Sequence, residues 1–344
     1  MIFSRFSSAG RFFLRAKIFF CLSWCFCQGG LDPKQFAETI TAKELKESLY
    51  VYASDYFQGR ETGEIGQKRA IDFLQNFYSS IGIPPAEGTE NYLQKMTLST
   101  KGEKVESENV VAIIRGSKYP NEYIVISSHL DHIGIDKNGE INNGADDDGS
   151  GTVAMLELAE AFKIASDNGI PPKRSIIFLH VTGEEKGLLG SRYYTNNPIY
   201  PLSETMVNLN IDMIGRKDLI QENDNYIYLI GSNILSNDLH EISEEMNDKY
   251  VKINLDYRYN DPNTLVFENG RNIPNRYYFR SDHYNFAQKN IPVIFYFSGT
   301  HEDYHRPGDT PDKILYSIFE KRTKLVFYTA WELANRKNKI KLNK

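Results

Sequence analysis

Cysteine is nearly missing from this chain. Among its 344 residues there are three cysteines, Cys21, Cys25 and Cys27, and all three lie in the first 27 residues. The rest of the sequence has no thiol that could form a disulfide, attack a substrate or bind a metal. Disulfide-rich scaffolds, cysteine hydrolases and thiolate metal sites are therefore excluded for that part.

Positive charge is also scarce. The chain has 40 basic and 45 acidic side chains, which gives a net charge of −5. The first 27 residues contain four basic side chains and no acid, so the net charge without them is −9. A nucleic-acid-binding protein usually carries the opposite sign of charge. We therefore expect no nucleic acid among the partners.

Apolar runs long enough to span a membrane are missing as well. Residues 18–27 are ten apolar or small residues that follow the basic stretch, whereas a spanning helix needs about 20. This pattern is typical of a secretory signal, so residues 1–29 are predicted to be a signal peptide or a lipoprotein leader. We expect an exported protein that is periplasmic, secreted or membrane-anchored as a lipoprotein. A disordered tail or a start codon assigned too early is the alternative.

Two amphipathic helices are predicted after this segment. Residues 41–44 (TAKE) match a capping box, and Leu45, Leu49, Tyr52 and Tyr56 follow at helical spacing. Residues 67–81 show the same periodicity. These two segments predict a helical beginning for the mature chain.

The sequence then alternates between short apolar runs and helix-like stretches. The predicted strands are 109–114, 123–127, 175–179, 206–211, 226–230 and 293–297, and the predicted helices are 151–165, 188–195, 235–250 and 313–336. Such alternation indicates a three-layer α/β/α fold with a mostly parallel central sheet and helices on both faces. We expect one domain over residues 30–344. Residues 30–104 would form a helical appendage and the first strand, and residues 105–335 the catalytic core.

Several predicted strands are followed by potential metal ligands. These are His129 and Asp131, then Glu184 and Glu185, then Asp212, and finally His305, with an acidic loop at 144–151 between the first two strands. Each alone has a structural explanation, such as a surface histidine, a helix cap or a solvated turn. Together, carboxylates at one sheet edge would repel one another by several kcal/mol unless cations neutralised them. A bound metal explains their joint placement.

The ligand types narrow the choice of metal. Two imidazoles with several carboxylates and no thiolate suit zinc or another borderline divalent ion. Six ligand positions exceed one tetrahedral site and match two ions that share a carboxylate. Asp131 stands two residues after His129 and can hold its second ring nitrogen. Of Glu184 and Glu185, one can bind metal while the other takes a proton from water.

Six motifs in order make the chain similar to a known family. The chain resembles metallopeptidase family 28, which includes bacterial di-zinc aminopeptidases, glutamate carboxypeptidase-type enzymes and glutaminyl cyclases. The resemblance covers about residues 105–335, and six collinear motifs are far more specific than one short pattern. The motifs are 129–131 (HLD), 144–151 (GADDDGSG), 182–185 (TGEE), 210–215 (NIDMIG), 280–283 (RSDH) and 303–310 (DYHRPGDT).

The resemblance implies two Zn2+ ions per chain and assigns their ligands. His129 and Asp212 would bind one zinc, Glu185 and His305 the other, and Asp147 would bridge both. Composition alone does not select Asp147 from the three consecutive aspartates. The other five histidines match no ligand position and are expected to be structural: His132, His180, His240, His283 and His301.

The resemblance also implies catalytic roles. Glu184 would be the general base, Asp131 would orient the first histidine ligand, and Tyr304 would steady the tetrahedral oxyanion. Arg280 and Asp282 match a segment that lies near the substrate in relatives, although a structural salt bridge or cap explains them equally well.

The expected function is that of a zinc-dependent aminopeptidase that cleaves peptides with a free N-terminus. A glutaminyl cyclase, which uses one zinc, is the runner-up, and a carboxypeptidase or dipeptidase of the same family is a further alternative. A non-catalytic peptide-binding ectodomain is disfavoured because no ligand and no catalytic carboxylate is missing.

Overall fold

The computed structural model describes residues 32–100, 102–268 and 270–344. The predicted leader, residues 1–29, lies outside these ranges. The helices are α1 Lys34–Ala37, α2 Ala42–Tyr52, α3 Ile65–Ser80, α4 Gly151–Asp167, α5 Leu189–Asn196, α6 Asn237–Met246, α7 His283–Ala287 and α8 Tyr316–Asn335. The strands are β1 Leu93–Thr100, β2 Glu103–Ile114, β3 Tyr119–His129, β4 Arg174–Val181, β5 Thr205–Ile211, β6 Tyr226–Ile230, β7 Asn254–Asp256, β8 Leu265–Glu268, β9 Arg271–Pro274 and β10 Val293–Phe297.

A large sheet of eight strands organises the molecule, in the order β1-β2-β4-β3-β5-β10-β6-β7. The four central strands β4, β3, β5 and β10 run parallel. Both flanks join them through antiparallel pairs, so the sheet as a whole is mixed. The parallel character predicted from the apolar runs therefore holds in the centre, where the strands are buried on both faces.

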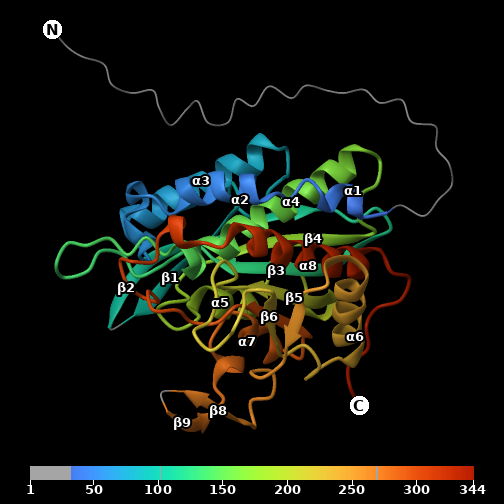
Figure 1. Ribbon diagram of the computed structural model, residues 1–344. Coiled ribbons are helices and arrows are strands. Elements are labelled where there is room, and N and C mark those ends of the chain that lie inside the picture. The colour runs from blue at the N-terminus through green and yellow to red at the C-terminus, as the bar shows by residue number, and fades with distance from the viewer. Residues whose placement is uncertain (1–31, 101, 269) are drawn as a thin grey trace.

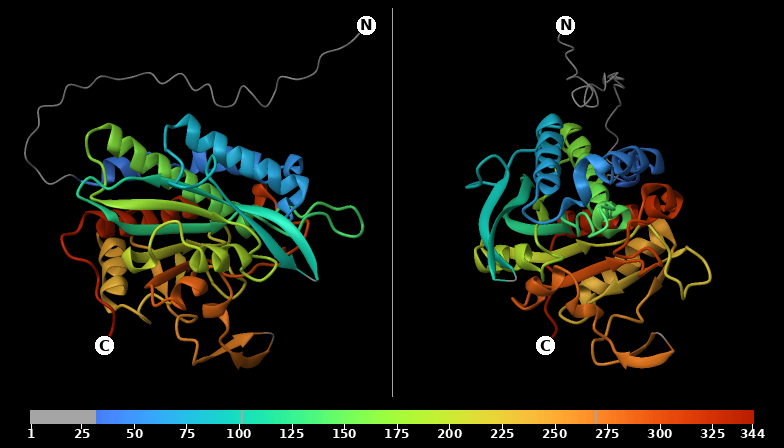
Figure 2. Two further views of the ribbon diagram at one scale, coloured as in Figure 1. Left: turned by 180° about the vertical axis from the view of Figure 1, so that it is seen from behind. Right: turned by 90° about the vertical axis from the view of Figure 1, so that its left-hand side faces the viewer.

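Helices cover both faces of the sheet and confirm the predicted three-layer α/β/α architecture. Figures 1 and 2 show α2, α3 and α4 lying over one face, with α5 and α7 on the other. Alternate side chains of β3 enter the two cores: Ile124 and Ile126 join the larger one, and Tyr123 and Val125 the smaller. Among the described residues, no helix is long and apolar enough to cross a lipid bilayer.

The predicted capping box begins α2. The Thr41 hydroxyl oxygen accepts a hydrogen bond from the Glu44 backbone N–H at 3.2 Å and donates its own proton to the Glu44 carboxylate at 3.0 Å. These bonds satisfy one of the free N–H groups of the first turn. Leu45, Leu49 and Tyr52 then face the larger core.

The β8–β9 hairpin was not predicted and projects from the body of the molecule (Figures 1 and 2). Each of its strands has four residues, and Leu265 and Phe267 are exposed. A strand this short that buries little surface leaves no clear alternation of apolar and polar residues. The sequence pattern therefore reads as an irregular loop.

The parallel strands bring the predicted ligand loops to one edge of the sheet. His129 lies beside Val181 at the end of β4, and Ile211 at the end of β5 lies beside Tyr296 of β10. In open α/β sheets, ligands bind beyond these carboxyl ends. The loops after β3, β4, β5 and β10 therefore meet at the same place.

Arg60 connects the N-terminal helices to these loops. Its guanidinium donates to the carbonyl oxygens of Leu130 at 3.2 Å, Asn143 at 2.7 Å and Gly144 at 2.9 Å. It also lies 4.7 Å from the centre of the Tyr52 ring and is 1% exposed. One buried cation thus holds the end of β3 and the start of the acidic loop together.

Replacement of Arg60 by Leu should lower the free energy of unfolding by about 3 kcal/mol or more, because several buried carbonyl groups lose their donor. Arg174→Leu is the matched control, since Arg174 is equally buried and donates to Leu333 and Arg336 carbonyl groups near the opposite edge. Urea unfolding measures both losses. Hydrogen exchange should accelerate over residues 130–148 in the Arg60 variant alone; equal acceleration there in both variants would contradict the assignment.

Candidate metal centre

Two groups of side chains at the carboxyl edge could each hold a metal ion. His129, Asp147 and Asp212 form the first group, and His132, Asp147 and Glu185 the second. In the first, His129 Nε2 lies 3.2 Å from Asp147 Oδ1 and 3.6 Å from Asp212 Oδ1. Asp147 is the residue common to both groups, which is the geometry that a bridging carboxylate requires.

His305 faces the second group. Its Nε2 lies 3.1 Å from Asp147 Oδ2 and 3.1 Å from Glu185 Oε2. The structure therefore brings together all five ligands expected from the sequence. His129 and Asp212 lie on one side of Asp147 and Glu185 and His305 on the other, which is the arrangement that the expected pairing requires.

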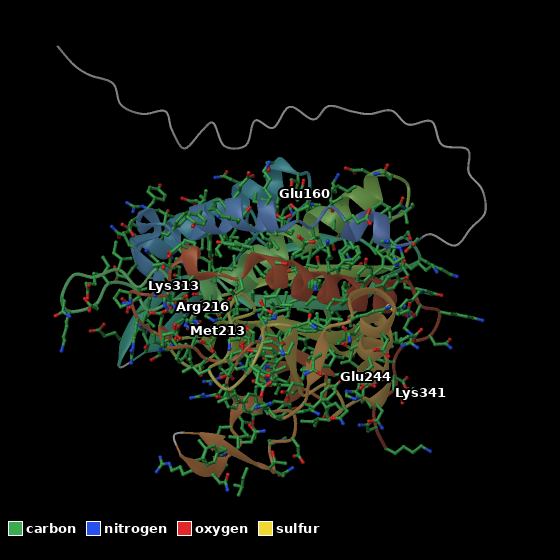
Figure 3. All side chains as sticks on the ribbon, in the orientation of Figure 1. Glu160, Met213, Arg216, Glu244, Lys313 and Lys341 are labelled. Carbon is green, nitrogen blue, oxygen red and sulfur yellow. The ribbon has the colours of Figure 1, made fainter. Side chains whose placement is uncertain are left out.

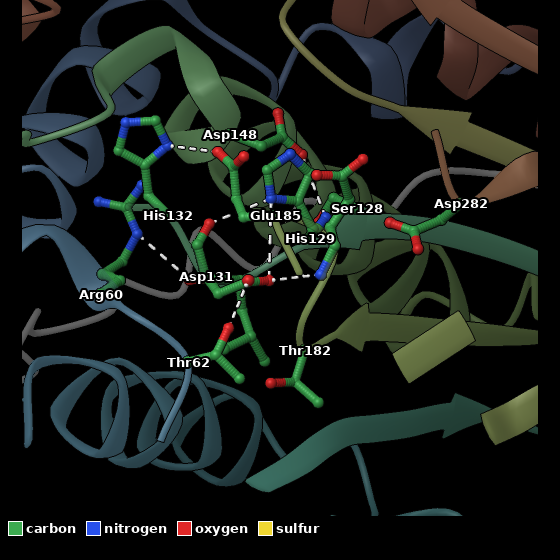
Figure 4. Close-up of polar contacts among 12 residues, drawn as sticks. Arg60, Thr62, Ser128, His129, Asp131, His132, Asp148, Thr182, Glu185 and Asp282 are labelled. Carbon is green, nitrogen blue, oxygen red and sulfur yellow. Dashed lines mark hydrogen bonds and ion pairs between the residues drawn. The ribbon is translucent and has the colours of Figure 1, made fainter. Parts of the chain in front are cut away.

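His132, which was expected to be a structural histidine, lies against the second group. Its Nδ1 lies 2.9 Å from Glu185 Oε1 and 3.7 Å from Asp147 Oδ2, and Figure 4 shows the ring facing Glu185. The residue stands just beyond the end of β3, three positions after His129. Its place in the same strand-end loop is the sequence signal that could have identified it.

Different hydrogen bonds give the three consecutive aspartates, residues 146–148, different roles. Asp146 Oδ1 accepts from the Gly215 N–H at 2.6 Å. Asp148 is occupied by three backbone N–H groups, those of His129, Gly151 and Met213. Asp146 and Asp148 thus support the main chain of the loop, and Asp147 is left to face both groups.

Asp131 orients His129 through its main chain rather than through the expected carboxylate. His129 Nδ1 lies 3.0 Å from the Asp131 carbonyl oxygen, and because a carbonyl only accepts, Nδ1 carries the proton and Nε2 is free to bind metal. The Asp131 carboxylate lies 3.9 Å from Nδ1 and accepts instead from the Thr62 hydroxyl at 2.8 Å and the Glu184 N–H at 3.2 Å. Figure 4 shows Thr62, Asp131 and His129 together.

A chain of buried hydrogen bonds ends on Asp212. Ser281 donates to Asp212 Oδ2 at 2.6 Å, Asn210 donates to Ser281 at 2.8 Å, and Ser127 donates to Asn210 at 2.7 Å. These bonds fix one carboxylate oxygen and leave the other directed at His129. Such outer partners orient a ligand and hold its charge in place.

Glu184 and Tyr304 line a cavity together with the whole first group. Burial and the nearby carboxylates of Glu185, Asp212 and Asp282 raise the pKa of Glu184 well above its ordinary value. Burial, followed by the charge of Asp147, also raises the pKa of Tyr304, so its hydroxyl keeps its proton. The cavity therefore contains a carboxylate suited to accept a proton and a phenol suited to donate a hydrogen bond.

The other wall of the cavity is largely apolar. Met213, Tyr277, Phe295 and Phe297 form it, and Arg280 contributes a cation that lies 5.3 Å from the centre of the Tyr277 ring. Arg280 is therefore placed where a substrate can reach it.

Of the two residues expected near the substrate, Asp282 fits the structural alternative better. This carboxylate has no exposed surface and accepts a hydrogen bond from Ser191 on α5. Burial raises its pKa to about 7. Asp282 therefore supports the packing of α5 behind the cavity.

Salt bridges anchor the loop that carries Tyr304 and His305. Asp303 accepts from Arg216 at 2.7 Å and from Lys313 at 2.8 Å. Figure 3 places Arg216, Met213 and Lys313 on one side of the molecule, away from Glu244 and Lys341. The loop is thereby fixed at the same edge as the two ligand groups.

The donor set fits a pair of divalent ions. It consists of imidazole and carboxylate groups, which zinc and similar ions prefer. Within the described part of the chain, Asp147 Oδ2, Glu185 Oε1 and both ring nitrogens of His132 have no hydrogen-bond partner of regular geometry. Although burial disfavours an imidazolium, Asp212 and Asp147 raise the pKa of His129 well above its ordinary value. The carboxylates of the centre thus favour a positive charge between them, which is what a metal-binding site requires.

Comparisons with known proteins show the family of the chain. The model of peptidase family M28 matches residues 109–330. Aminopeptidase YwaD of Bacillus subtilis (strain 168) is 26% identical over 272 residues, which cover 76% of this chain and 52% of that protein. The chain spans about half the length of YwaD and about a third or less of the other curated relatives compared.

Two solved structures share the fold. BSAP, a zinc aminopeptidase from Bacillus subtilis, has a TM-score of 0.66 at 15% identity and covers 88% of this chain and 98% of its own. Glutaminyl cyclase of Bacteroides thetaiotaomicron, bound to N-acetylhistamine, has a TM-score of 0.64 at 16% identity and covers 87% and 99%. Both confirm the zinc-exopeptidase-like architecture expected from the sequence.

Ser281→Ala should weaken metal binding by about 10–100-fold, because Asp212 loses the donor that orients it. Calorimetric titration of the metal-free protein with Zn2+ measures this loss. Ser298→Ala is the control, since Ser298 is equally buried but donates to the Met213 carbonyl oxygen at 2.9 Å. Unchanged affinity in the Ser281 variant would show that the hydrogen-bond chain does not support the centre.

Proposed function

The chain belongs to peptidase family M28, and we propose from this premise that it is a zinc-dependent aminopeptidase with two Zn2+ ions per chain. Its substrates are peptides with a free N-terminus, and the reaction is hydrolysis of the first peptide bond. One observation carries the proposal: Glu184 lines the same cavity as a group of metal-ligand side chains that shares Asp147 with a second group. The activities named for YwaD and BSAP support it.

Each metal ligand is assigned to an ion according to the group of side chains in which it lies. His129 and Asp212 would hold one ion, Glu185 and His305 the other, and Asp147 would bridge them. When bound, zinc lowers the pKa of water and polarises a carbonyl group as a Lewis acid.

Glu184 acts as the general base. It takes a proton from the attacking water and passes it to the amine that leaves. Burial raises the pKa of its carboxylate, which favours acceptance of a proton. The Asp131 carboxylate accepts from the Glu184 backbone N–H, so Asp131 positions the base through its carboxylate and His129 through its main-chain carbonyl oxygen.

Tyr304 stabilises the oxyanion that forms when water adds to the carbonyl carbon. Its ring stacks on His305 with centroids 4.0 Å apart, which fixes the hydroxyl at the cavity. A preorganised donor of this kind is effective because it does not have to reorient during the reaction. Arg280 binds a more distant part of the peptide.

A free α-amine on the substrate explains the choice of a terminal bond. The cavity contains the carboxylates of Glu184, Asp147 and Asp212, and an ammonium group is attracted to such a cluster. A glutaminyl cyclase activity is the second candidate, favoured by the shared fold. The completeness of both ligand groups favours two ions and hydrolysis.

We also propose that residues 30–344 act as one catalytic domain and that the protein is exported. The basic and apolar leader at residues 1–29 supports a periplasmic, secreted or lipid-anchored location.

Glu184→Gln should lower kcat by about 10²–10⁴-fold, because an amide cannot accept the proton from water. Turnover of an aminoacyl p-nitroanilide and zinc content by elemental analysis are measured on the same sample, and zinc content should stay unchanged. Glu61→Gln is a control for the loss of one carboxylate close by, since Glu61 pairs with Lys186 at 2.7 Å. Full turnover in the Glu184 variant with zinc retained would remove Glu184 as the base.

Blocking the substrate amine should slow cleavage by at least about 10-fold, because a contact with a charged group is lost. A panel of free, N-acetylated and C-amidated peptides, followed by mass spectrometry, measures this preference. The zinc-saturated protein should contain two zinc ions per chain. A reproducible content of one zinc, with ring closure of N-terminal glutamine, would favour the cyclase; cleavage of N-blocked peptides at their C-terminus would favour a carboxypeptidase.

A further inference from the structure

His132 is a buried histidine that faces carboxylates. It has no exposed surface, and its Nδ1 lies 2.9 Å from Glu185 Oε1 and 3.7 Å from Asp147 Oδ2. Neither ring nitrogen makes a hydrogen bond of regular geometry with any described residue. A buried imidazole in this position requires a partner, and the assigned ligand set gives it none.

The surrounding main chain fixes the His132 ring in this direction. The His132 N–H donates to the Arg60 carbonyl oxygen at 3.2 Å. The ring packs on Gly144, where an added Cβ would lie 2.6 Å from His132 Cδ2. Gly144 also has a φ of +57°, which disfavours a side chain there. The ring is therefore held against the second ligand group.

The spacing of the polar atoms suits one ion with four protein ligands. Zinc bonds of about 2.0–2.1 Å place neighbouring ligands of a tetrahedral site about 3.3 Å apart. His132 Nδ1 lies 2.9 Å from a Glu185 carboxylate oxygen and 3.7 Å from an Asp147 carboxylate oxygen. His305 Nε2 lies 3.1 Å from an oxygen of each of the same two carboxylates. His132 thus lies as close to Glu185 and Asp147 as an assigned ligand does.

We infer that His132 is a metal ligand, so that four side chains hold one ion of the pair and three hold the other. The four are His132, Asp147, Glu185 and His305. The inference rests on the metal centre of the proposed function and does not depend on peptide hydrolysis.

The two sites then differ in what they can do. A site closed by four protein ligands retains its ion, whereas a site with three keeps a position open for water or substrate. The cavity is lined by the whole three-ligand group and by Glu184, but of the four-ligand group only the shared Asp147 reaches it. The closed site fills first and tightly, and the open site exchanges its ion and faces the substrate.

The competing role for His132 is a hydrogen bond to Glu185 without metal contact. His132→Gln separates the two roles, because an amide donates a hydrogen bond but is a poor zinc ligand. If His132 only oriented Glu185, this variant would keep the tight affinity within about 10-fold of the unmodified protein. As a ligand, His132 should be essential to that affinity.

The experiment titrates the metal-free full chain with Zn2+ by calorimetry and with Co2+ by visible absorption. We expect one tight and one weaker site in the unmodified protein. His132→Gln and His132→Ala should both lose more than about 100-fold in tight-site affinity, beyond the range for an outer partner. Affinity retained in the Gln variant would overturn the inference.

X-ray absorption of the protein loaded with one zinc provides a second readout that needs no variant. The closed site predicts two imidazoles on that zinc, from His132 and His305. One imidazole would overturn the inference, even if the His132 variants failed to fold. Because neither readout uses turnover, an inactive protein with the expected metal binding would contradict the proposed aminopeptidase and leave the His132 assignment intact.

His283→Gln is the matched control. His283 also has no exposed surface and no regular hydrogen bond from its ring nitrogens among the described residues. It stacks on Phe295 at 4.8 Å, and burial lowers its pKa to about 3, so it is neutral. Its replacement removes a buried imidazole of the same size and should leave both metal affinities unchanged.

Discussion

Repulsion between buried carboxylates is the constraint on which the rest of this structure depends. Asp147, Glu184, Glu185 and Asp212 meet within one sheet edge because parallel strands end there together. Like charges at such distances in a low dielectric cost several kcal/mol unless cations offset them. Imidazole groups lie among them, and two divalent ions would supply the remaining positive charge. Metal binding and folding of this edge are therefore coupled.

Neutral donors from the main chain hold the loops without cancelling the charge that the ions need. The Asp309 carboxylate accepts from the N–H groups of Asp146 and Asp147 at 3.0–3.1 Å, and Asp148 accepts three further N–H groups. Arg60 reaches the loop through carbonyl oxygens only. The charged side chains of Asp309, Asp148 and Arg60 thus bond to backbone groups of the loop. The carboxylate of Asp147 therefore stays available to both ligand groups.

The sequence predicts those parts of the fold and of the metal centre that depend on residues close together in the chain. Buried strands of β-branched and aromatic residues have a clear pattern, and parallel pairing then fixes where the residues after β3, β4, β5 and β10 must lie. The choice of Asp147 from three aspartates came from the family resemblance, because it depends on which backbone N–H groups occupy Asp146 and Asp148. The position of His132 beside Glu185 was not predicted: it stands in the same strand-end loop as His129, but its ring is directed by contacts with Gly144 and Arg60, which are distant in sequence. The two roles left open for Asp282 could not be separated, because a hydrogen bond from Ser191 on α5 has no signature in the four residues of the motif.

The asymmetry of the centre follows from how the sheet presents its loops. The loops after β3 and β4 supply His132, which is fully buried and whose N–H donates to the Arg60 carbonyl oxygen, and Glu185. The cavity instead opens toward Asp212 and the apolar wall of Phe295 and Phe297. An ion on the side of His132 gains a fourth protein ligand, whereas an ion on the cavity side keeps both an open position and Glu184 beside it. The two ions can therefore be the same metal and still differ, one being retained and the other reactive. The additional ligand His132 on one side is enough to make this difference.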